Sequence, residues 1–292
     1  MSEEKLPLRI VPAAAGTRPI ALVCDSPHSG TWYPDDFGHA VGRQALRRSE
    51  DTHVDVLWDT VPAAGGALLC AEFPRSYIDP NREETDIDVS MLSDAWPREA
   101  RPSRQCTQLG NGLVWRKTPE KRAIYDRLLS AAEVQRRIDG CWRPYREALA
   151  ALLRQAEAAH GGWWHLNLHS MPGNVYQRLG LPASRPVPDV VLGDRHGSTC
   201  DPGFLALVKH AFEARGLRVA VNDPYAGLEL IRLSGEPARG RHSLQIEINR
   251  ALYMDEATRE PNAGFAALRE SIGRVTDAVA AYVRDRSAPP GA

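Results

Sequence analysis

The chain of 292 residues lacks the sequence signatures of several common protein classes. No stretch reaches the roughly 18 uninterrupted apolar residues that a membrane-spanning helix needs. A glycine-rich phosphate loop followed by lysine is absent, as is a GxGxxG fingerprint, which argues against nucleotide and dinucleotide binding. The GxSxG motif is also missing, which weakens an interpretation as a serine hydrolase.

The charge balance and the cysteines exclude further classes. With 36 basic and 37 acidic residues the net charge is -1, so we expect no general attraction to nucleic acid or membranes. The five cysteines are widely spaced and form no CxxC pair, which is typical of reduced thiols. The first ten residues lack the basic and apolar regions of a signal peptide. We therefore expect a cytoplasmic protein without a nucleic-acid or membrane partner, and the sequence leaves its oligomeric state open.

Short apolar runs alternate with helical patterns along the chain. This alternation predicts an α/β sandwich with a mixed, mainly parallel sheet. Each expected strand is wholly apolar or rich in β-branched and aromatic residues. The expected strands are residues 20–24, 67–70, 163–168, 190–192, 217–221 and 243–248.

Two long helices are predicted. The first begins at Ser130, where Glu133 completes a capping-box pattern, and it ends at the glycine pair that starts with Gly161. Pro144 lies inside this apolar repeat and predicts a kink or two separate helices, because proline removes a backbone donor. The second helix is expected over residues 262–284.

We expect a single domain spanning residues 1–292, because no internal repeat or long linker is visible. Residues 74–119 differ from the rest in their many charges, their prolines and their weak periodicity. A connection of this length is usually functional or disordered. We interpret it as an ordered, irregular excursion of the chain that forms one wall of a functional site.

Two polar clusters lie in the first sixty residues. His28 follows the first predicted strand, beside a proline and a glycine that indicate a turn. Asp51 precedes the apolar residues Val54 and Leu57, and we expect it in the first turn of their helix, near the positive end of the dipole. Each has a plainer explanation, a surface loop for His28 and helix capping for Asp51.

A third cluster contains His165 and His169, whose spacing would suit two metal ligands on one helical turn. Glycines before this segment, and proline with glycine after it, favour a strand instead. On a strand His165, Asn167 and His169 share one face. His169 would then stand where the strand ends, with His165 deeper, as a supporting group or a core histidine.

The fourth cluster places Glu247 in mid-strand, with Gln245 on the same face. A buried carboxylate is costly unless it is paired, so Glu247 indicates either an edge strand with one wet face or a catalytic carboxylate. Arg82 could bind a carboxylate or a developing oxyanion, or be an ordinary surface arginine. Two histidines and one acid suit a divalent, zinc-like ion, and a nearby glutamate could accept a proton from water.

Taken in order, these motifs resemble the N-formylglutamate amidohydrolase (formylglutamate deformylase) family over about residues 20–256. The motifs that carry the resemblance are DSPHSG (25–30), DTHVD (51–55), YIDPNR (77–82), GNGLV (110–114), LHS (168–170) and QIEI (245–248). The resemblance implies a three-layer αβα fold of the zinc-carboxypeptidase-like (phosphorylase/hydrolase-like) type. It also implies metal-dependent hydrolysis of an N-acyl amino acid, here N-formyl-L-glutamate to formate and L-glutamate in histidine degradation.

By the same resemblance, His28, Asp51 and His169 would hold one divalent metal ion, which we expect to be zinc, although Glu50 is close enough to Asp51 to be confused with it. Glu247 would be the general base and proton shuttle. Asn81 and Arg82 would hold a carboxylate or the oxyanion, with Arg82 counted among the catalytic groups. Further candidates for pairing with the substrate carboxylates are Arg178, Arg195 and Arg232.

Some segments depart from the deformylase pattern. They are residues 171–173, 194–197 and 222–227. These departures leave the identity of the acyl group and of the amino acid open. The alternatives are a deacylase for another N-acyl amino acid, a carboxypeptidase-like hydrolase of short peptides, and a non-catalytic module that binds an amino acid.

Overall fold

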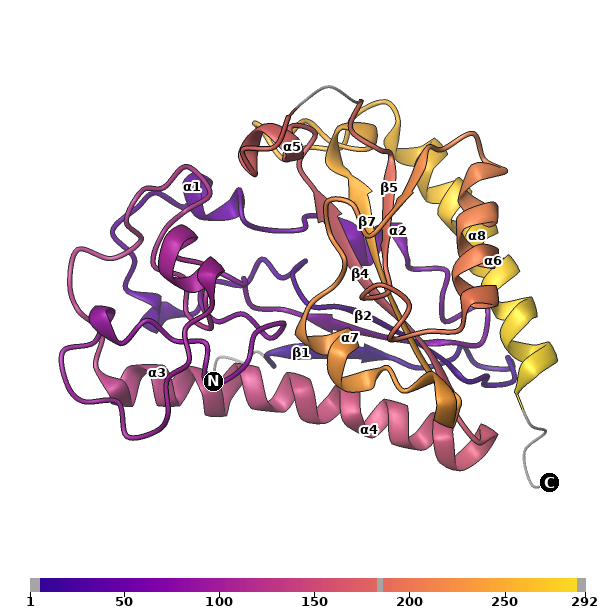
Figure 1. Cartoon of the computed structure of the whole chain (residues 1–292), viewed down its shortest axis with the longest axis horizontal. Coiled ribbons are helices and arrows are strands. Elements are labelled where there is room, and N and C mark those ends of the chain that lie inside the picture. The colour runs from indigo at the N-terminus through magenta and orange to yellow at the C-terminus, as the bar shows by residue number, and fades with distance from the viewer. Residues whose placement is uncertain (1–5, 183–185, 288–292) are drawn as a thin grey trace. The chain divides into compact units, whose positions relative to one another are not determined.

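A computed structural model describes residues 6–182 and 186–287 (Figure 1). The expectation that no signal peptide is present concerns the first ten residues, and the first five of these lie outside the described residues. The described residues form a seven-stranded sheet in the order β1-β3-β2-β4-β7-β5-β6. The strands are β1 (Leu8–Val11), β2 (Leu22–Ser26), β3 (Ala67–Ala71), β4 (Trp163–Met171), β5 (Val190–Gly193), β6 (Val219–Val221) and β7 (Arg241–Asn249).

The sheet is mixed and mainly parallel in the pairs that can be described. β2 with β4, β4 with β7, and β5 with β6 run parallel, whereas β5 and β7 run antiparallel. All six predicted strands are present, so the predicted α/β class is confirmed. The boundaries differ by a few residues, since β4 and β7 each continue beyond their apolar runs into polar residues. β1 was not predicted; it has only four residues, and its two central residues are exposed.

Eight α-helices accompany these strands in the described part of the chain. They are α1 (Arg43–Arg47), α2 (Val54–Leu57), α3 (Ala131–Arg137), α4 (Arg143–His160), α5 (Val175–Arg178), α6 (Pro202–Glu213), α7 (Glu229–Ser234) and α8 (Phe265–Arg286). The predicted helix over residues 262–284 corresponds to α8. No helix within residues 6–182 and 186–287 has the length and apolar character needed to cross a membrane.

The chain divides into two compact units that alternate along the sequence. The first unit contains the described residues of Met1–Arg9, Pro27–Thr52 and Cys70–Leu149. The second contains those of Ile10–Ser26, His53–Leu69 and Ala150–Ala292. The expectation of a single domain stays a prediction.

In the second unit, helices cover both faces of the sheet. Trp164 of β4 packs against Phe204 of α6 and Tyr282 of α8, and these two helices lie side by side (Figure 1). The next residue, His165, contacts Ser234 of α7. Because successive side chains on a strand point to opposite faces, α7 lies on the face opposite α6 and α8. The predicted helix–sheet–helix layering is therefore present in this unit.

In the first unit, the long predicted helix begins as expected. Ser130 accepts a hydrogen bond from the backbone N–H of Glu133, and the Glu133 carboxylate accepts one from the backbone of Ser130. A π-helical turn over Ile138–Trp142 separates α3 from α4, and Pro144 follows it as the second residue of α4. The wider turn accommodates the proline, so the predicted interruption is confirmed as a π-turn within a continuing helix.

Residues 74–119 are irregular, as predicted, and lie wholly within the first unit. Their helical structure is a 3-10 turn at Val89–Met91 and a π-turn at Gln105–Leu109.

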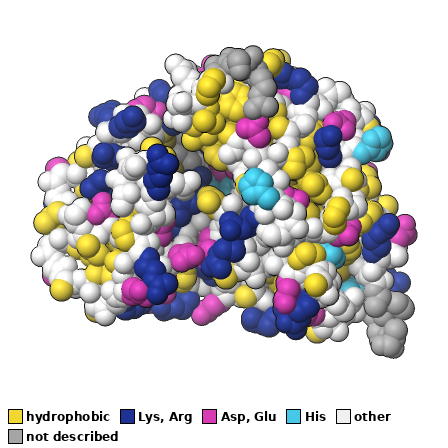
Figure 2. Space-filling model, viewed as in Figure 1, with side chains coloured by type: hydrophobic (Ala, Val, Ile, Leu, Met, Phe, Trp, Pro, Cys, Tyr) yellow, Lys and Arg dark blue, Asp and Glu magenta, His cyan; other side chains and the backbone are white. Residues whose placement is uncertain are grey.

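On the face seen in Figure 2, basic and acidic side chains lie intermixed, as expected for nearly equal numbers of each.

Candidate active site

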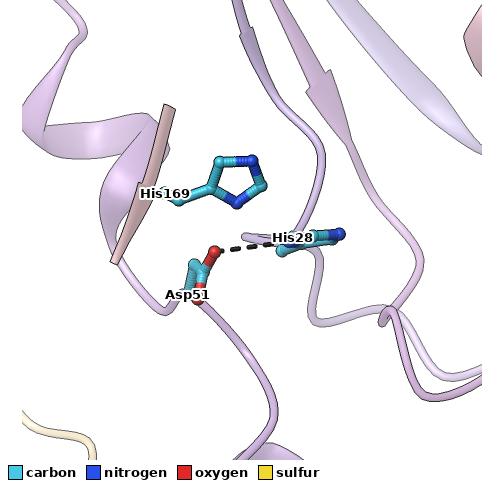
Figure 3. A group of neighbouring side chains, drawn as sticks. All are labelled: His28, Asp51 and His169. Atoms are coloured by element: carbon cyan, nitrogen blue, oxygen red, sulfur yellow. Dashed lines mark ion pairs between the residues drawn. The ribbon is translucent and has the colours of Figure 1, made fainter. Parts of the chain in front are cut away.

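His28 lies two residues beyond the end of β2 and is fully buried. Its Nε2 is 2.7 Å from Oδ1 of Asp79, and its Nδ1 is 3.4 Å from Oδ2 of Asp51 (Figure 3). An ionised carboxylate can only accept, so Nε2 is the nitrogen that donates its proton to Asp79. An imidazole that is neutral and carries its proton on Nε2 has its lone pair on Nδ1, which is the nitrogen that faces Asp51.

Asp79 is a buried carboxylate with several strong donors. Arg75 donates to its Oδ2 from Nε and Nη2 at 3.1 and 2.9 Å, and Trp115 donates to the same oxygen at 3.2 Å. Burial alone would raise the pKa of Asp79, but the nearby charges of Arg75 and Arg82, together with the hydrogen bond from His28, hold that pKa well below its usual value. Asp79 is therefore an ionised and firmly oriented partner for His28. Its place within the YIDPNR motif alone did not indicate this role.

Asp51 lies in the loop before α2. Its backbone N–H donates to the carbonyl oxygen of His28 at 2.9 Å, which brings the two residues together. The prediction that Asp51 occupies the first turn of a helix is wrong. His53 adopts a left-handed conformation with φ of 68°, and the helix begins only at Val54. Asp51 therefore precedes the helix, whose N-cap is His53.

Glu50, the alternative to Asp51, has other partners. The Tyr33 hydroxyl donates to its Oε1 at 2.5 Å, and Arg47 and Thr52 donate to Oε2 at 3.2 Å each. Burial and the Glu50 carboxylate raise the pKa of Tyr33 far above its usual value, so Tyr33 stays a donor. These contacts give Glu50 a structural explanation.

Asn81 and Arg82 follow Asp79 after a single proline, Pro80. The backbone N–H of Asn81 donates to Asp79 Oδ1 at 2.9 Å. Arg82 is only 7% exposed, and its Nε donates to the carbonyl oxygen of Asn111 at 2.9 Å. Burial lowers the pKa of Arg82. The surface-arginine interpretation is therefore wrong for Arg82, whereas its predicted role toward a substrate stays a prediction.

In the second unit, β4 and β7 carry a shared polar face. His169 lies beside Glu247 and Asn167 beside Gln245 in the parallel register of the two strands. The side-chain carbonyl oxygen (Oδ1) of Asn167 is 2.7 Å from Nε2 of His169. Nε2 of Gln245 donates to Oε1 of Glu247 at 3.0 Å. The interpretation of β7 as an edge strand is wrong, because it lies between β4 and β5 and Glu247 is 8% exposed.

The strand interpretation of the third cluster is confirmed. His165 is fully buried within β4, and its Nε2 contacts Asp25 Oδ1 at 2.8 Å. Its Nδ1 lies 2.7 Å from the Ser243 hydroxyl. His165 is thus a satisfied core histidine that lies two residues behind Asn167.

The three further arginines occupy different surroundings in the second unit. Arg178 is exposed in the last turn of α5, and Arg195 is half-buried in a left-handed backbone conformation. Arg232 of α7 forms a bidentate ion pair with Glu229, in which Nε donates to Oε2 at 2.8 Å and Nη2 donates to Oε1 at 2.9 Å. Their proposed contacts with a substrate remain predictions.

Three of the predicted residues form a group with the chemistry of a metal site. His28, Asp51 and His169 are all buried, each offers one ligand atom, and these atoms lie within 4.8 Å of one another (Figure 3). Imidazole nitrogens and a carboxylate oxygen are ligands that zinc takes in proteins, at about 2 Å. The donor set therefore fits a divalent ion of this type.

The relatives of this chain define its class, a hydrolase that acts on an amide bond. Residues 20–254 match the model of the N-formylglutamate amidohydrolases, and the chain belongs to that family. The resemblance inferred from the order of the motifs is confirmed.

Individual relatives agree with this membership. The chain is similar to the crystal structure of N-formylglutamate amidohydrolase from Ralstonia eutropha JMP134, with 50% identity, a TM-score of 0.93 and coverage of 96% of this chain and 99% of that one. It is 26% identical to the N-formylglutamate deformylase of Pseudomonas aeruginosa, over 92% of this chain and 96% of the relative. A solved protein of Agrobacterium tumefaciens, 18% identical with a TM-score of 0.64 and 95% coverage of each chain, is similar in fold alone.

Proposed function

We propose that this protein hydrolyses N-formyl-L-glutamate to formate and L-glutamate in a metal-dependent reaction, as a step of histidine degradation. Membership of the family and the names of its relatives support the substrate. The observation that carries the metal dependence is the group formed by His28, Asp51 and His169, whose ligand atoms lie within 4.8 Å of one another.

We assign the metal to His28, Asp51 and His169, and we expect zinc from their donor set. When bound, such an ion would polarise the formyl oxygen and lower the pKa of a water molecule. The protein contributes orientation, because Asp79 and Asn167 each engage one ring nitrogen of a histidine ligand. Groups of this kind fix the tautomer and the ring orientation of a ligand.

Glu247 is the proposed proton carrier. It would accept a proton from the attacking water, whose oxygen bonds to the formyl carbon, and pass that proton to the departing amine nitrogen as the C–N bond breaks. One water is consumed: its first proton reaches the amine nitrogen through Glu247, and its second, released as the new carboxylic acid ionises, is taken up by the amine. Formate and glutamate with a protonated amino group are the products. The register beside His169 and the hydrogen bond from Gln245 support this role, because both hold the carboxylate at the end of β7.

Arg82 is the proposed partner of a substrate carboxylate or of the developing oxyanion, with Asn81 beside it. Its buried guanidinium supports this, because a charge removed from water attracts an anion more strongly than an exposed one. Arg178, Arg195 and Arg232 are proposed for the second carboxylate. We also propose a cytoplasmic location, and the five free, buried cysteines are consistent with a reducing compartment.

The test is to measure formate and glutamate released from N-formyl-L-glutamate, with N-acetyl-L-glutamate and a dipeptide as competing substrates. We expect formate release to exceed hydrolysis of both, and Glu247→Gln to remove turnover while the metal content stays unchanged. Preference for the dipeptide would favour the carboxypeptidase-like alternative. Full activity of Glu247→Gln would contradict the role of Glu247.

A further inference from the structure

Asn167 lies between a buried carboxylate and His169. β2 and β4 run parallel, and Asp25 is the register partner of Asn167. Nδ2 of Asn167 donates to Asp25 Oδ1 at 2.8 Å, and the Asn167 carbonyl oxygen lies 2.7 Å from Nε2 of His169. Asp25 and Asn167 are both fully buried, so both ends of this amide are engaged away from solvent.

The direction of the Asn167 amide follows from the contacts of Asp25. Nε2 of His165 also lies 2.8 Å from the same Oδ1 that Asn167 contacts, so two nitrogens converge on one carboxylate oxygen. This oxygen acts as an acceptor. An amide has one donating and one accepting end, and the reversed amide would place two acceptors face to face in a buried position. The NH₂ group of Asn167 therefore faces Asp25.

The same direction fixes the proton of His169. With the NH₂ group turned to Asp25, the end of the Asn167 amide that faces Nε2 of His169 is its carbonyl oxygen, at 2.7 Å, so this nitrogen donates to it. A neutral imidazole has a single N–H, so Nδ1 of His169 keeps its lone pair. A metal ligand needs such a lone pair, and the hydrogen bond at the other nitrogen decides which atom supplies it.

We propose that Asn167, oriented by Asp25, is the positioning residue that holds the proton of His169 on Nε2 and makes Nδ1 the metal-binding atom. The part that concerns metal binding rests on the proposed function. The position of the proton does not, since it follows from hydrogen bonds of the second unit alone.

The wild-type protein provides a direct test. Protein labelled with ¹⁵N-histidine is freed of metal and held at pH 8, where imidazoles are ordinarily neutral. Long-range ¹H–¹⁵N spectra then distinguish the two tautomers, and the signal of His169 is identified by its loss in His169→Gln. We expect the Nε2–H tautomer to predominate. A predominant Nδ1–H tautomer would overturn the proposal.

Two substitutions at Asn167 separate its two contacts. Asn167→Leu removes the acceptor at a similar volume, so we expect a mixture of tautomers and zinc binding weakened by about 10- to 100-fold. Asn167→Asp keeps an acceptor for His169 but places a second carboxylate against Asp25, so we expect the tautomer to persist and the melting temperature to fall. Unchanged tautomer and zinc affinity in Asn167→Leu would contradict the proposal. If either variant fails to fold, the wild-type spectrum still decides.

The outcomes separate this inference from the proposed function. An Nε2–H tautomer in a wild-type protein that binds no zinc would contradict the metal-dependent function and leave the role of Asn167 intact. Zinc binding by a protein whose metal-free His169 carries its proton on Nδ1 would contradict only the role of Asn167.

Discussion

The two histidines of the candidate metal site are supported by different chemistry. In the first unit, His28 donates to the charged carboxylate of Asp79, which Arg75 also contacts. In the second unit, His169 donates to the neutral amide of Asn167, and the negative charge lies one residue further away. Both arrangements leave Nδ1 as the remaining ring nitrogen. The comparison indicates that the same tautomer can be held by a charged acceptor at His28 and by a neutral acceptor at His169.

The largest expected effect comes from removing a histidine ligand itself. His169→Ala removes one of three proposed donors, so we expect the zinc content of the purified protein to fall from about one ion per chain to almost none. His210→Ala, at an exposed position of α6, is the matched control and should keep its zinc. Elemental analysis measures both. A fully metallated His169→Ala would refute the ligand role.

Removing the charge that supports His28 should have the next largest effect. Asp79→Asn leaves the shape nearly unchanged but takes the counter-charge from Arg75, and breaking a buried pair costs about 3 kcal/mol or more. We expect this loss in the urea unfolding of the metal-free protein, together with weaker zinc binding than in Asn167→Leu.

Glu72→Gln provides the control for that comparison in the same unit. Its ion pair with Arg9 is partly exposed, and such pairs contribute less than about 1 kcal/mol. Equal unfolding free energies for Asp79→Asn and Glu72→Gln would show that the Asp79 carboxylate stabilises the fold no more than a partly exposed ion pair, which would contradict its role as a buried, charged support of His28.

A smaller effect is expected at Gln245, which holds Glu247 through a neutral hydrogen bond. Gln245→Leu removes this bond, which contributes about 1 kcal/mol, so we expect kcat to fall by up to roughly tenfold. Stability should change little, because Oε1 of Gln245 is buried without a hydrogen-bond partner among the described residues. Formate release and zinc content are measured together, and a loss of zinc would show that Gln245 acts on the metal site instead.

The smallest effect is expected from Glu133, a partly exposed carboxylate in contrast to Asp79. A hydrogen bond from Arg127, reinforced by the backbone of Ser130, lowers the pKa of Glu133 from 4.5 to about 2. Because the folded pKa is the lower one, its stabilisation is present above pH 4.5 and is lost as the pH falls toward 2. Between pH 5 and 3 the free energy of unfolding should fall further in the wild-type protein than in Glu133→Gln. The difference between the two should be less than about 1 kcal/mol. Identical pH profiles would contradict this assignment.

The strands and the polar clusters were predictable because their periodicity is local. Alternation along β4 is enough to predict that Asn167 and His169 share one face, and the pattern of Glu247 on β7 is equally clear. Asp79 could not be assigned in this way, because its contact with His28 spans 51 positions and begins in an irregular segment. The choice between Glu50 and Asp51 was likewise beyond the sequence, since only their three-dimensional partners differ.

The most direct test of the account is a zinc titration of metal-free protein during hydrolysis of N-formyl-L-glutamate. If His28, Asp51 and His169 hold one catalytic ion, formate release should rise in proportion to added zinc and level off at one equivalent per chain. Full formate release before any metal is added, from protein shown to be metal-free by elemental analysis, would contradict the account.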